Sequence, residues 1–175
     1  MPRKFSVAIL TVSDRCSRGE AIDTSGPALA EIVQRELGGD VIAAACVPDE
    51  RTAIVGQLRA WSGGGEAPDL LLTTGGTGLA PRDVTPEATL DVLERRHVGL
   101  MELIRLRCYL ANPRAFLSRG EAGTIGRCLI INLPGSQRGS TECLRAVLDV
   151  LPHALETLRG EADHVDDRGS PRERT

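Results

Sequence analysis

Aromatic side chains are scarce in this 175-residue sequence, and basic side chains do not exceed acidic ones; together these two shortages argue against one class of partner. The chain holds two phenylalanines, one tyrosine and one tryptophan, too few for a platform on which nucleic-acid bases stack. Acidic side chains outnumber basic ones, 24 to 21, and the resulting formal net charge of −3 argues against the basic face that a phosphate backbone requires. We therefore expect no nucleic-acid partner.

Long apolar runs and paired cysteines are also missing. The first apolar run covers residues 7–12, which is too short for a signal peptide or a membrane span. The five cysteines are scattered without a Cys-x-x-Cys pair, which indicates reduced thiols rather than a disulfide framework or a zinc site. These features predict a cytoplasmic protein with no membrane segment.

Apolar residues recur at spacings typical of strands and helices in alternation. The predicted strands cover residues 6–12, 41–47, 69–73 and 127–133. The predicted helices cover residues 27–37, 52–61, 99–111 and 140–150, with a further helix opened by Thr85-Pro86 and capped by Thr85. This alternation predicts an α/β fold of three α/β/α layers with a mostly parallel central sheet. The length favours one domain, residues 1–160, followed by a charged, frayed tail at 161–175.

The residues that follow the predicted strands are the best candidates for a binding site, because ligands of open α/β sheets lie beyond the carboxyl ends of the strands. The four segments there are Ser13-Asp14-Arg15, Pro48-Asp49-Glu50, Thr74-Gly75-Gly76-Thr77-Gly78 and Asn132-Leu133-Pro134-Gly135. Together they offer glycine-rich backbone, small hydroxyl groups and carboxylates.

The glycine-rich segment 73–78 is typical of a backbone nest that binds phosphate through consecutive N–H groups. It matches neither the P-loop nor the dinucleotide fingerprint, and a plain turn remains the alternative. Asp83 follows this segment, and Asp49 is expected to face the same crevice. Two carboxylates beside a phosphate site suit a magnesium–triphosphate complex. The alternative is that Asp49 and Asp83 are two acids of surface loops without a role in binding.

The chain resembles the Mog/MoaB family, which includes molybdopterin adenylyltransferases and the matching domain of gephyrin. Four blocks carry the resemblance, Thr11-Val12-Ser13-Asp14-Arg15, the run from Thr73 to Thr89, Phe116-Leu117-Ser118-Arg119 and Asn132-Leu133-Pro134-Gly135. The resemblance implies that the terminal phosphate of molybdopterin attacks the α-phosphorus of ATP and releases pyrophosphate. Positioning and charge neutralisation supply most of the catalysis in such a step.

The resemblance also implies roles for individual residues. Asp49 and Asp83 are the implied essential carboxylates and hold Mg²⁺ through the triphosphate. The implied nucleotide-binding residues are Ser13, Asp14, Thr74, Gly75, Gly76, Thr77, Gly78, Pro134 and Gly135. The implied molybdopterin-binding residues are Arg82, Ser118, Arg119 and Asn132, with Arg119 suited to the phosphate by its forked donors. The family further implies a homotrimer and transfer of the product to a molybdate-inserting enzyme.

Two positions depart from the family pattern and concern the pterin side. Gln137 and Arg138 stand where the family often has Pro and Lys, and Cys108 replaces a Ser, which weakens a hydrogen bond because a thiol is a poorer donor. Two alternatives to the enzyme stay open. One is a non-catalytic, MoaB-like protein that binds and carries molybdopterin; the other is molybdate insertion, which normally requires further domains.

Overall fold

The computed structural model describes residues 3–161, and the predicted charged tail falls almost entirely outside this range. The strands are β1 (Ser6–Val12), β2 (Asp40–Val47), β3 (Leu70–Thr74), β4 (Arg95–Arg96), β5 (Ala122–Ile125) and β6 (Cys128–Leu133). The helices are α1 (Asp14–Ser17), α2 (Ser25–Ile32), α3 (Arg51–Ser62), α4 (Thr85–Leu90), α5 (Val98–Tyr109), α6 (Gln137–Arg145) and α7 (Leu151–Arg159), with a π-helical turn η1 (Val33–Leu37) and a 3₁₀ turn η2 (Pro113–Leu117).

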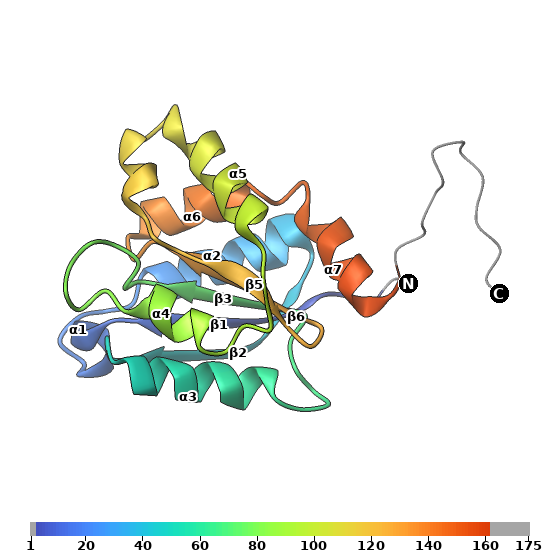
Figure 1. Cartoon of the computed structure of the whole chain (residues 1–175), viewed down its shortest axis with the longest axis horizontal. Coiled ribbons are helices and arrows are strands. Elements are labelled where there is room, and N and C mark those ends of the chain that lie inside the picture. The colour runs from blue at the N-terminus through green and yellow to red at the C-terminus, as the bar shows by residue number, and fades with distance from the viewer. Residues whose placement is uncertain (1–2, 162–175) are drawn as a thin grey trace.

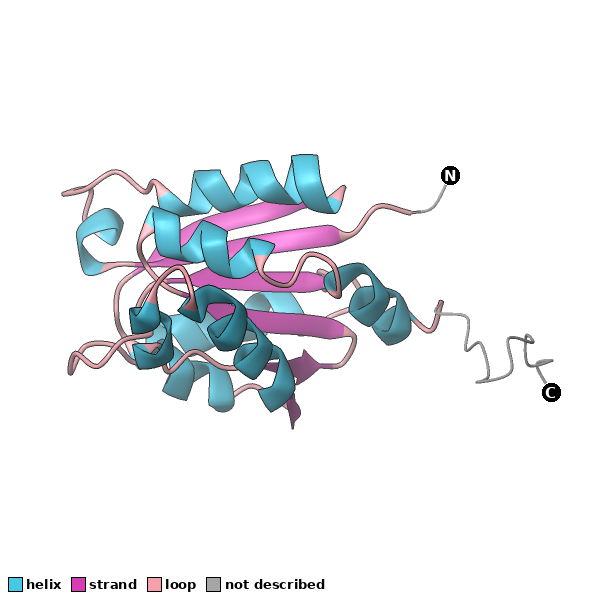
Figure 2. Ribbon diagram, turned by 90° about the horizontal axis from the view of Figure 1, so that it is seen from above, coloured by secondary structure: helices cyan, strands magenta, loops and turns pink. Residues whose placement is uncertain are grey.

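The strands form one sheet in the order β2-β1-β3-β6-β5-β4. The strands β2, β1, β3 and β6 are parallel to one another. The sheet continues from β6 through β5 to β4, and these pairings are antiparallel. Helices cover both faces, as Figures 1 and 2 show. The predicted α/β fold with a mostly parallel sheet is therefore confirmed.

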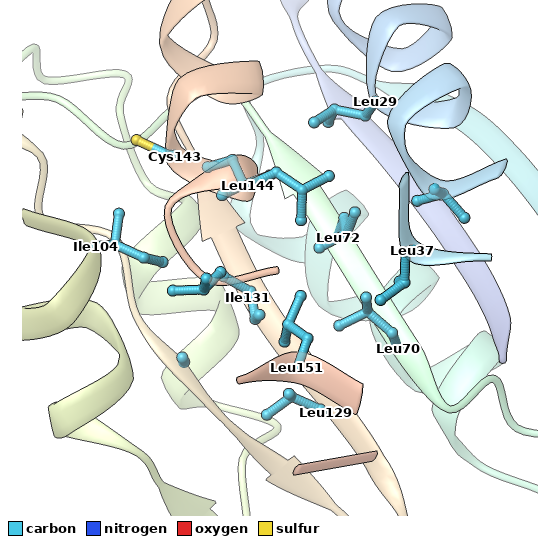
Figure 3. Close-up of a cluster of buried hydrophobic side chains, with 14 of the residues drawn as sticks. Leu29, Leu37, Leu70, Leu72, Ile104, Leu129, Ile131, Cys143, Leu144 and Leu151 are labelled. Atoms are coloured by element: carbon cyan, nitrogen blue, oxygen red, sulfur yellow. The ribbon is translucent and has the colours of Figure 1, made fainter. Parts of the chain in front are cut away.

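Alternate residues of the central strands point into two separate cores, which follows from the period of two in a β-strand. Val7 and Ile9 of β1 face α2, α5, α6 and α7, where the larger core lies (Figure 3). Ala8 and Leu10 of the same strand face the smaller core under α3 and α4. A strand that is buried on both faces has an unbroken run of apolar residues in its sequence. These strands could therefore be predicted from the sequence.

The first long helix begins earlier than predicted because Asp23 caps it. The Asp23 carboxylate accepts the backbone N–H groups of Ser25 and Gly26, at 3.0 Å each. The helix then continues as η1 and ends at Gly38, whose φ of +70° suits a residue without a side chain.

Several elements were not predicted, and the bounds of some predicted helices were wrong. The missed elements are β4, β5 and α7, and the short α1 was also not expected. The predicted helix 140–150 corresponds to α6, which ends at Arg145 before a separate α7 begins. The predicted helix 99–111 corresponds to α5, which ends before Pro113 as expected, and Pro113 then begins the separate turn η2, which the Asn112 side chain caps.

An ion pair attaches α7 to the amino-terminal end of the sheet, at the opposite end of the strands from α1 (Figure 1). Arg159 donates to both carboxylate oxygens of Asp69, at 2.8 and 2.7 Å, and both side chains are almost fully buried. Asp69 also accepts the N–H and hydroxyl of Ser6 at 2.7 Å each. Because every partner is satisfied, this pair anchors α7 to β1 and β3. No helix within residues 3–161 has the length and apolar character to span a bilayer.

Candidate active site

The loops that follow β1, β2, β3 and β6 meet at one edge of the sheet, as predicted. The N–H of Ser13 donates to Val47 O at 2.9 Å, and the N–H of Gly75 donates to Leu133 O at 3.1 Å. The Thr74 hydroxyl donates to Pro134 O at 2.7 Å. Backbone and side-chain hydrogen bonds thus tie the four loops together at the carboxyl ends of the parallel strands.

The turn after β3 requires glycine at two positions. Gly75 has a φ of +109°, and a Cβ there would lie 2.1 Å from Val12 O. Gly76 has a φ of +61°, and its Cβ would lie 2.4 Å from the Thr85 hydroxyl. Within residues 3–161, no hydrogen bond engages the N–H groups of Gly76, Thr77 or Gly78. Unpaired N–H groups in a tight glycine turn form an anion-binding concavity.

Thr85 stabilises this turn instead of capping a helix. Its hydroxyl donates to Gly75 O at 2.9 Å and its N–H donates to Gly76 O at 3.1 Å. Thr85 is already the first residue of α4, and the side chain of the preceding Val84 cannot cap it. The predicted cap was therefore wrong, and the threonine instead sets the shape of the glycine turn.

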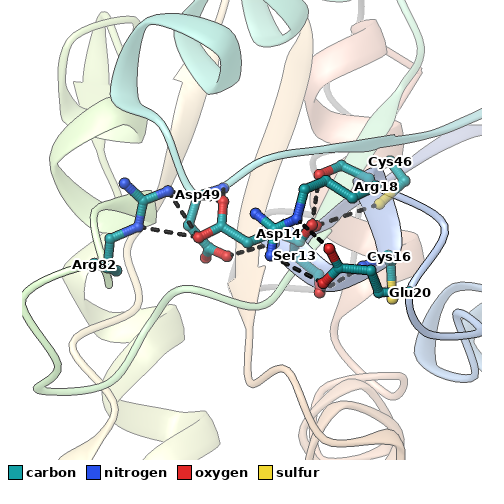
Figure 4. A network of polar contacts seen from close by, with 9 residues as sticks. Ser13, Asp14, Cys16, Arg18, Glu20, Cys46, Asp49 and Arg82 are labelled. Atoms are coloured by element: carbon teal, nitrogen blue, oxygen red, sulfur yellow. Dashed lines mark hydrogen bonds and ion pairs between the residues drawn. The ribbon is translucent and has the colours of Figure 1, made fainter.

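Asp49 and Asp14 hold each other in place through a reciprocal pair of hydrogen bonds (Figure 4). The Asp49 carboxylate accepts the N–H of Asp14 at 2.8 Å, and the Asp14 carboxylate accepts the N–H of Asp49 at 3.1 Å. Both oxygens of Asp14 also accept from Arg82, at 2.7 Å from its Nη2. The guanidinium of Arg82 therefore orients Asp14, which in turn orients the loop of Asp49.

These contacts give the two carboxylates opposite pKa shifts. The hydrogen bond from Arg82 lowers the pKa of Asp14 below its ordinary value. Burial raises the pKa of Asp49, and the negative charges of Asp14 and Asp83 raise it further. Asp49 is thus a half-buried carboxylate with excess negative charge around it, which favours a cation at this position.

Asp83 lies on the other side of the glycine turn. Its carboxylate accepts the N–H of Ala80 at 2.9 Å, and a Cβ at Gly78 would lie 2.8 Å from its Oδ2. The corresponding Cβ at Gly76 would lie 3.2 Å from Oδ1 of Asp49. The two acids predicted to be essential therefore contact the same glycine turn. No group of three or more His, Cys, Asp or Glu side chains within residues 3–161 forms a metal-binding cluster.

Arg119 holds the segment between the glycine turn and α4. Its Nε donates to Gly78 O at 2.8 Å, its Nη2 donates to Asp83 O at 2.5 Å, and its Nη1 pairs with Glu87. Its backbone N–H also donates to Thr77 O at 2.8 Å. The forked donors that the resemblance assigns to a substrate phosphate are engaged with this loop, so the contacts of Arg119 in this structure are those of a residue that positions the loop.

Two other side chains that were predicted to contact a ligand are buried in the structure. Asn132 has no exposed surface, and its side chain bonds to Thr73, to Thr89 and to the N–H of Glu121. Thr74 is 1% exposed, and its hydroxyl is committed to the Pro134 carbonyl. Both side chains shape the strand ends from within the core, so neither is available to a ligand. Arg82, assigned to molybdopterin, is bound to Asp14.

A cavity of about 510 Å³ opens beside the glycine turn, between it and the α5, η2 and α6 segments. Gly76, Thr77, Gly78, Ser118 and Gly135 line it, as does Asp83. The Ser118 hydroxyl donates to the Thr77 hydroxyl at 3.3 Å, so Ser118 is held against the glycine turn. Ser13 does not line the cavity; its side chain instead caps α1 by accepting the N–H of Cys16 at 3.3 Å.

Several residues that the sequence did not indicate also line the cavity, among them Asn112, Arg114, Glu142 and Cys143. The Cys143 and Cys108 thiols lie 3.8 Å apart in its wall, and burial raises the pKa of both. These cysteines are therefore neutral apolar wall residues. No signal in the sequence marked Glu142 as a cavity residue, because it does not lie among the buried positions of α6, which are Ser140, Cys143 and Leu144.

Known proteins with similar sequences and structures point to one family. Residues 8–153 match the family described as "Probable molybdopterin binding domain". The chain is 37% identical over 163 residues to a molybdopterin adenylyltransferase of Helicobacter pylori, covering 93% of this chain and 92% of that protein. It is 52% identical to the structure of the molybdopterin biosynthesis enzyme MoaB of Thermus thermophilus, with a TM-score of 0.83, covering 89% of this chain and 97% of that one.

Longer proteins contain a similar segment. The Drosophila melanogaster molybdenum cofactor synthesis protein cinnamon is 39% identical over 161 residues, which cover 92% of this chain. The chain spans 27% of the length of cinnamon and 23% of that of gephyrin from Dictyostelium discoideum.

Proposed function

The chain belongs to the family of probable molybdopterin binding domains, as its sequence predicted, and we propose that it is a molybdopterin adenylyltransferase of molybdenum cofactor biosynthesis. An oxygen of the molybdopterin phosphate forms a bond to the α-phosphorus of ATP, and the bond to the β-phosphate oxygen breaks to release pyrophosphate. The observation that carries the proposal is the position of Asp49 and Asp83 against one glycine turn, which with Asp83 lines a cavity.

The glycine turn is the proposed phosphate site. The N–H groups of Gly76, Thr77 and Gly78 are not engaged within the described part of the chain, and such groups bind phosphate oxygens. Arg119 and Thr85 keep the turn rigid, so its donors are oriented before the substrate arrives. Preorganised donors of this kind stabilise charge that develops in a transition state.

Asp49 and Asp83 are the proposed residues that hold Mg²⁺ with the triphosphate. Two carboxylates beside a phosphate site fit this ion, because Mg²⁺ takes few protein ligands and completes its shell with water and phosphate oxygens. The raised pKa of Asp49, caused by burial and then by neighbouring negative charge, is relieved when a cation binds. The ion supplies neutralisation and orientation of the triphosphate.

We further propose that the protein acts in the cytoplasm as a homotrimer and passes its product to a molybdate-inserting enzyme. An exposed apolar surface on α5 and η2 supports association between copies of the chain. Leu110 is 91% exposed, and Tyr109 stacks edge-to-face on Phe116 with ring centroids 5.5 Å apart, both about half exposed. Exposed apolar surface of this kind marks interaction sites.

The decisive experiment measures pyrophosphate release with molybdopterin and Mg-ATP. We expect release that depends on molybdopterin, and we expect Asp83→Asn to abolish it while the melting temperature stays unchanged. Asp40→Asn is the matched control, because within residues 3–161 the only polar contact of the Asp40 carboxylate is an exposed ion pair with Lys4. Pyrophosphate release near the wild-type rate from Asp83→Asn would contradict the role given to this carboxylate.

A second candidate is a non-catalytic protein that binds and carries molybdopterin. The description of the matching family favours it to this extent, because that description names the binding of molybdopterin and no reaction. The two candidates differ in one result. A wild-type protein that binds molybdopterin but releases no pyrophosphate is the carrier.

A further inference from the structure

A carboxylate in the wall of the cavity has no place in the mechanism described above. Glu142 lies on α6 and lines the cavity, and apart from Asp83 it is the only acidic residue to do so within residues 3–161. Its Oε1 accepts from Nε of Arg138 at 2.7 Å, one helical turn earlier. Its Oε2 has no hydrogen bond within the described part of the chain.

The charge of this side chain conflicts with a phosphate-bearing ligand lying beside it. A carboxylate repels phosphate unless a cation lies between them, as proposed for Asp83, and it pairs favourably with a ligand that presents hydrogen-bond donors. The phosphate site lies at the glycine turn, where Gly76, Thr77 and Gly78 line the same cavity. The end of the cavity at α6 therefore suits a neutral part of the ligand that is rich in N–H groups.

Resting on the proposed function, we propose that Glu142 is the specificity-determining residue that recognises the pterin ring of molybdopterin. The pyrimidine part of a pterin carries a 2-amino group beside N3–H, two parallel donors that match the two oxygens of a carboxylate. Adenine presents a donor beside an acceptor at its corresponding edge, so a carboxylate cannot pair with it in the same way. Glu142 thereby separates the pterin from the adenine of ATP.

The surrounding residues complement this assignment. Asn112 lines the same part of the cavity; its Oδ1 accepts the N–H of Arg114 at 3.1 Å, which leaves its amide N–H groups for the 4-oxo group of the pterin. The thiols of Cys108 and Cys143 and the side chain of Leu117 form apolar walls that suit the faces of a flat ring. The ring then lies at α6, with the phosphate directed toward the glycine turn.

Two small fluorescent probes test the proposal without requiring turnover. Pterin and lumazine differ at position 2, where lumazine has an oxo group in place of the amino group. We expect the wild-type protein to bind pterin about ten- to a hundredfold more tightly than lumazine, the range of a charge-assisted hydrogen bond. Glu142→Gln is expected to bring this ratio close to one by weakening the binding of pterin.

Arg138→Gln is the matched control, because it breaks the same ion pair on α6 and keeps the carboxylate. It is expected to retain the preference for pterin, and melting temperatures verify that both variants are folded. The proposal is overturned if Glu142→Gln retains the preference, if Arg138→Gln loses it equally, or if the wild type shows no preference or no pterin binding. A wild type that prefers pterin but releases no pyrophosphate overturns only the proposed reaction. Molybdopterin-dependent release with the same KM for molybdopterin in Glu142→Gln overturns only this inference.

Discussion

Replacing Arg119 with alanine tests whether this residue positions a loop or binds a substrate. The substitution removes the donors to Gly78 O and Asp83 O and leaves the Glu87 carboxylate without its cation. Three hydrogen bonds from a charged group would contribute several kcal/mol if buried, but the side chains of Arg119 and Glu87 are 36% and 40% exposed. After allowance for solvent we expect a loss of about 2 kcal/mol.

That loss predicts two measurable effects. A change of about 2 kcal/mol lowers the melting temperature of a protein of this size by about 4–8 °C. The loop that carries Asp83 also becomes mobile, and because small misplacements of catalytic groups can cost about a hundredfold in rate, we expect kcat to fall more than KM rises. Thermal unfolding and steady-state pyrophosphate release measure the two effects.

Arg127→Ala serves as the control, because Arg127 is exposed and forms no ion pair within the described residues. It is expected to leave both the melting temperature and kcat unchanged. An Arg119→Ala protein with wild-type melting temperature and kcat but a tenfold higher KM for molybdopterin would refute this reasoning. Arg119 would then bind the substrate phosphate directly, as the family resemblance implied.

Two further predictions concern stability. Asn132→Leu should lower the unfolding free energy by about 2–4 kcal/mol, because the hydroxyls of Thr73 and Thr89 lose a buried partner. Urea titration measures this loss, and an unchanged unfolding free energy would show that the amide does not stabilise the fold. Burial opposes ionisation of Asp69, but hydrogen bonds from Arg159 and Ser6 outweigh it and hold the pKa of Asp69 well below its ordinary 3.8. This stabilisation is therefore present above about pH 4 and is lost as the pH falls. Asp69→Asn should reduce the fall of the unfolding free energy below pH 4, measured by urea titration at several pH values. The same fall in the variant as in the wild type would contradict the lowered pKa of Asp69.

The sequence predicted the parts of the fold that depend on local periodicity. β1 and β3 are buried on both faces, and their apolar runs identify them without knowledge of their neighbours. The two-residue β4 and the short β5 carry no such pattern. They form because β5 pairs with the edge of β6 and β4 in turn pairs with β5. At Gly123 a Cβ would lie 2.2 Å from Arg95 O, a close approach that only the folded sheet creates.

The candidate site divides in the same way. By itself the sequence determined the glycine turn and the two acids beside it. Gly75, Gly76 and Asp49 follow strands closely, Asp83 comes soon after the glycines, and the carboxyl ends of parallel strands share one edge. Only the tertiary structure decided which charged partner each side chain takes. Arg82 reaches Asp14 across 68 positions of the chain, and no spacing rule extends that far.

The same distinction explains the corrected assignments and the new one. Arg119 and Asn132 lie within motifs of the site, but their N–H donors bind to groups that the fold brings to them from other segments. Glu142 has the helical spacing of a surface residue, and it lines a cavity only because α6 packs near α5 and η2. Residue type and local order determined the chemistry available to this protein. Packing decided which of those groups remain free to meet a ligand, because a hydrogen-bonding group already paired inside the fold has little left to offer outside it.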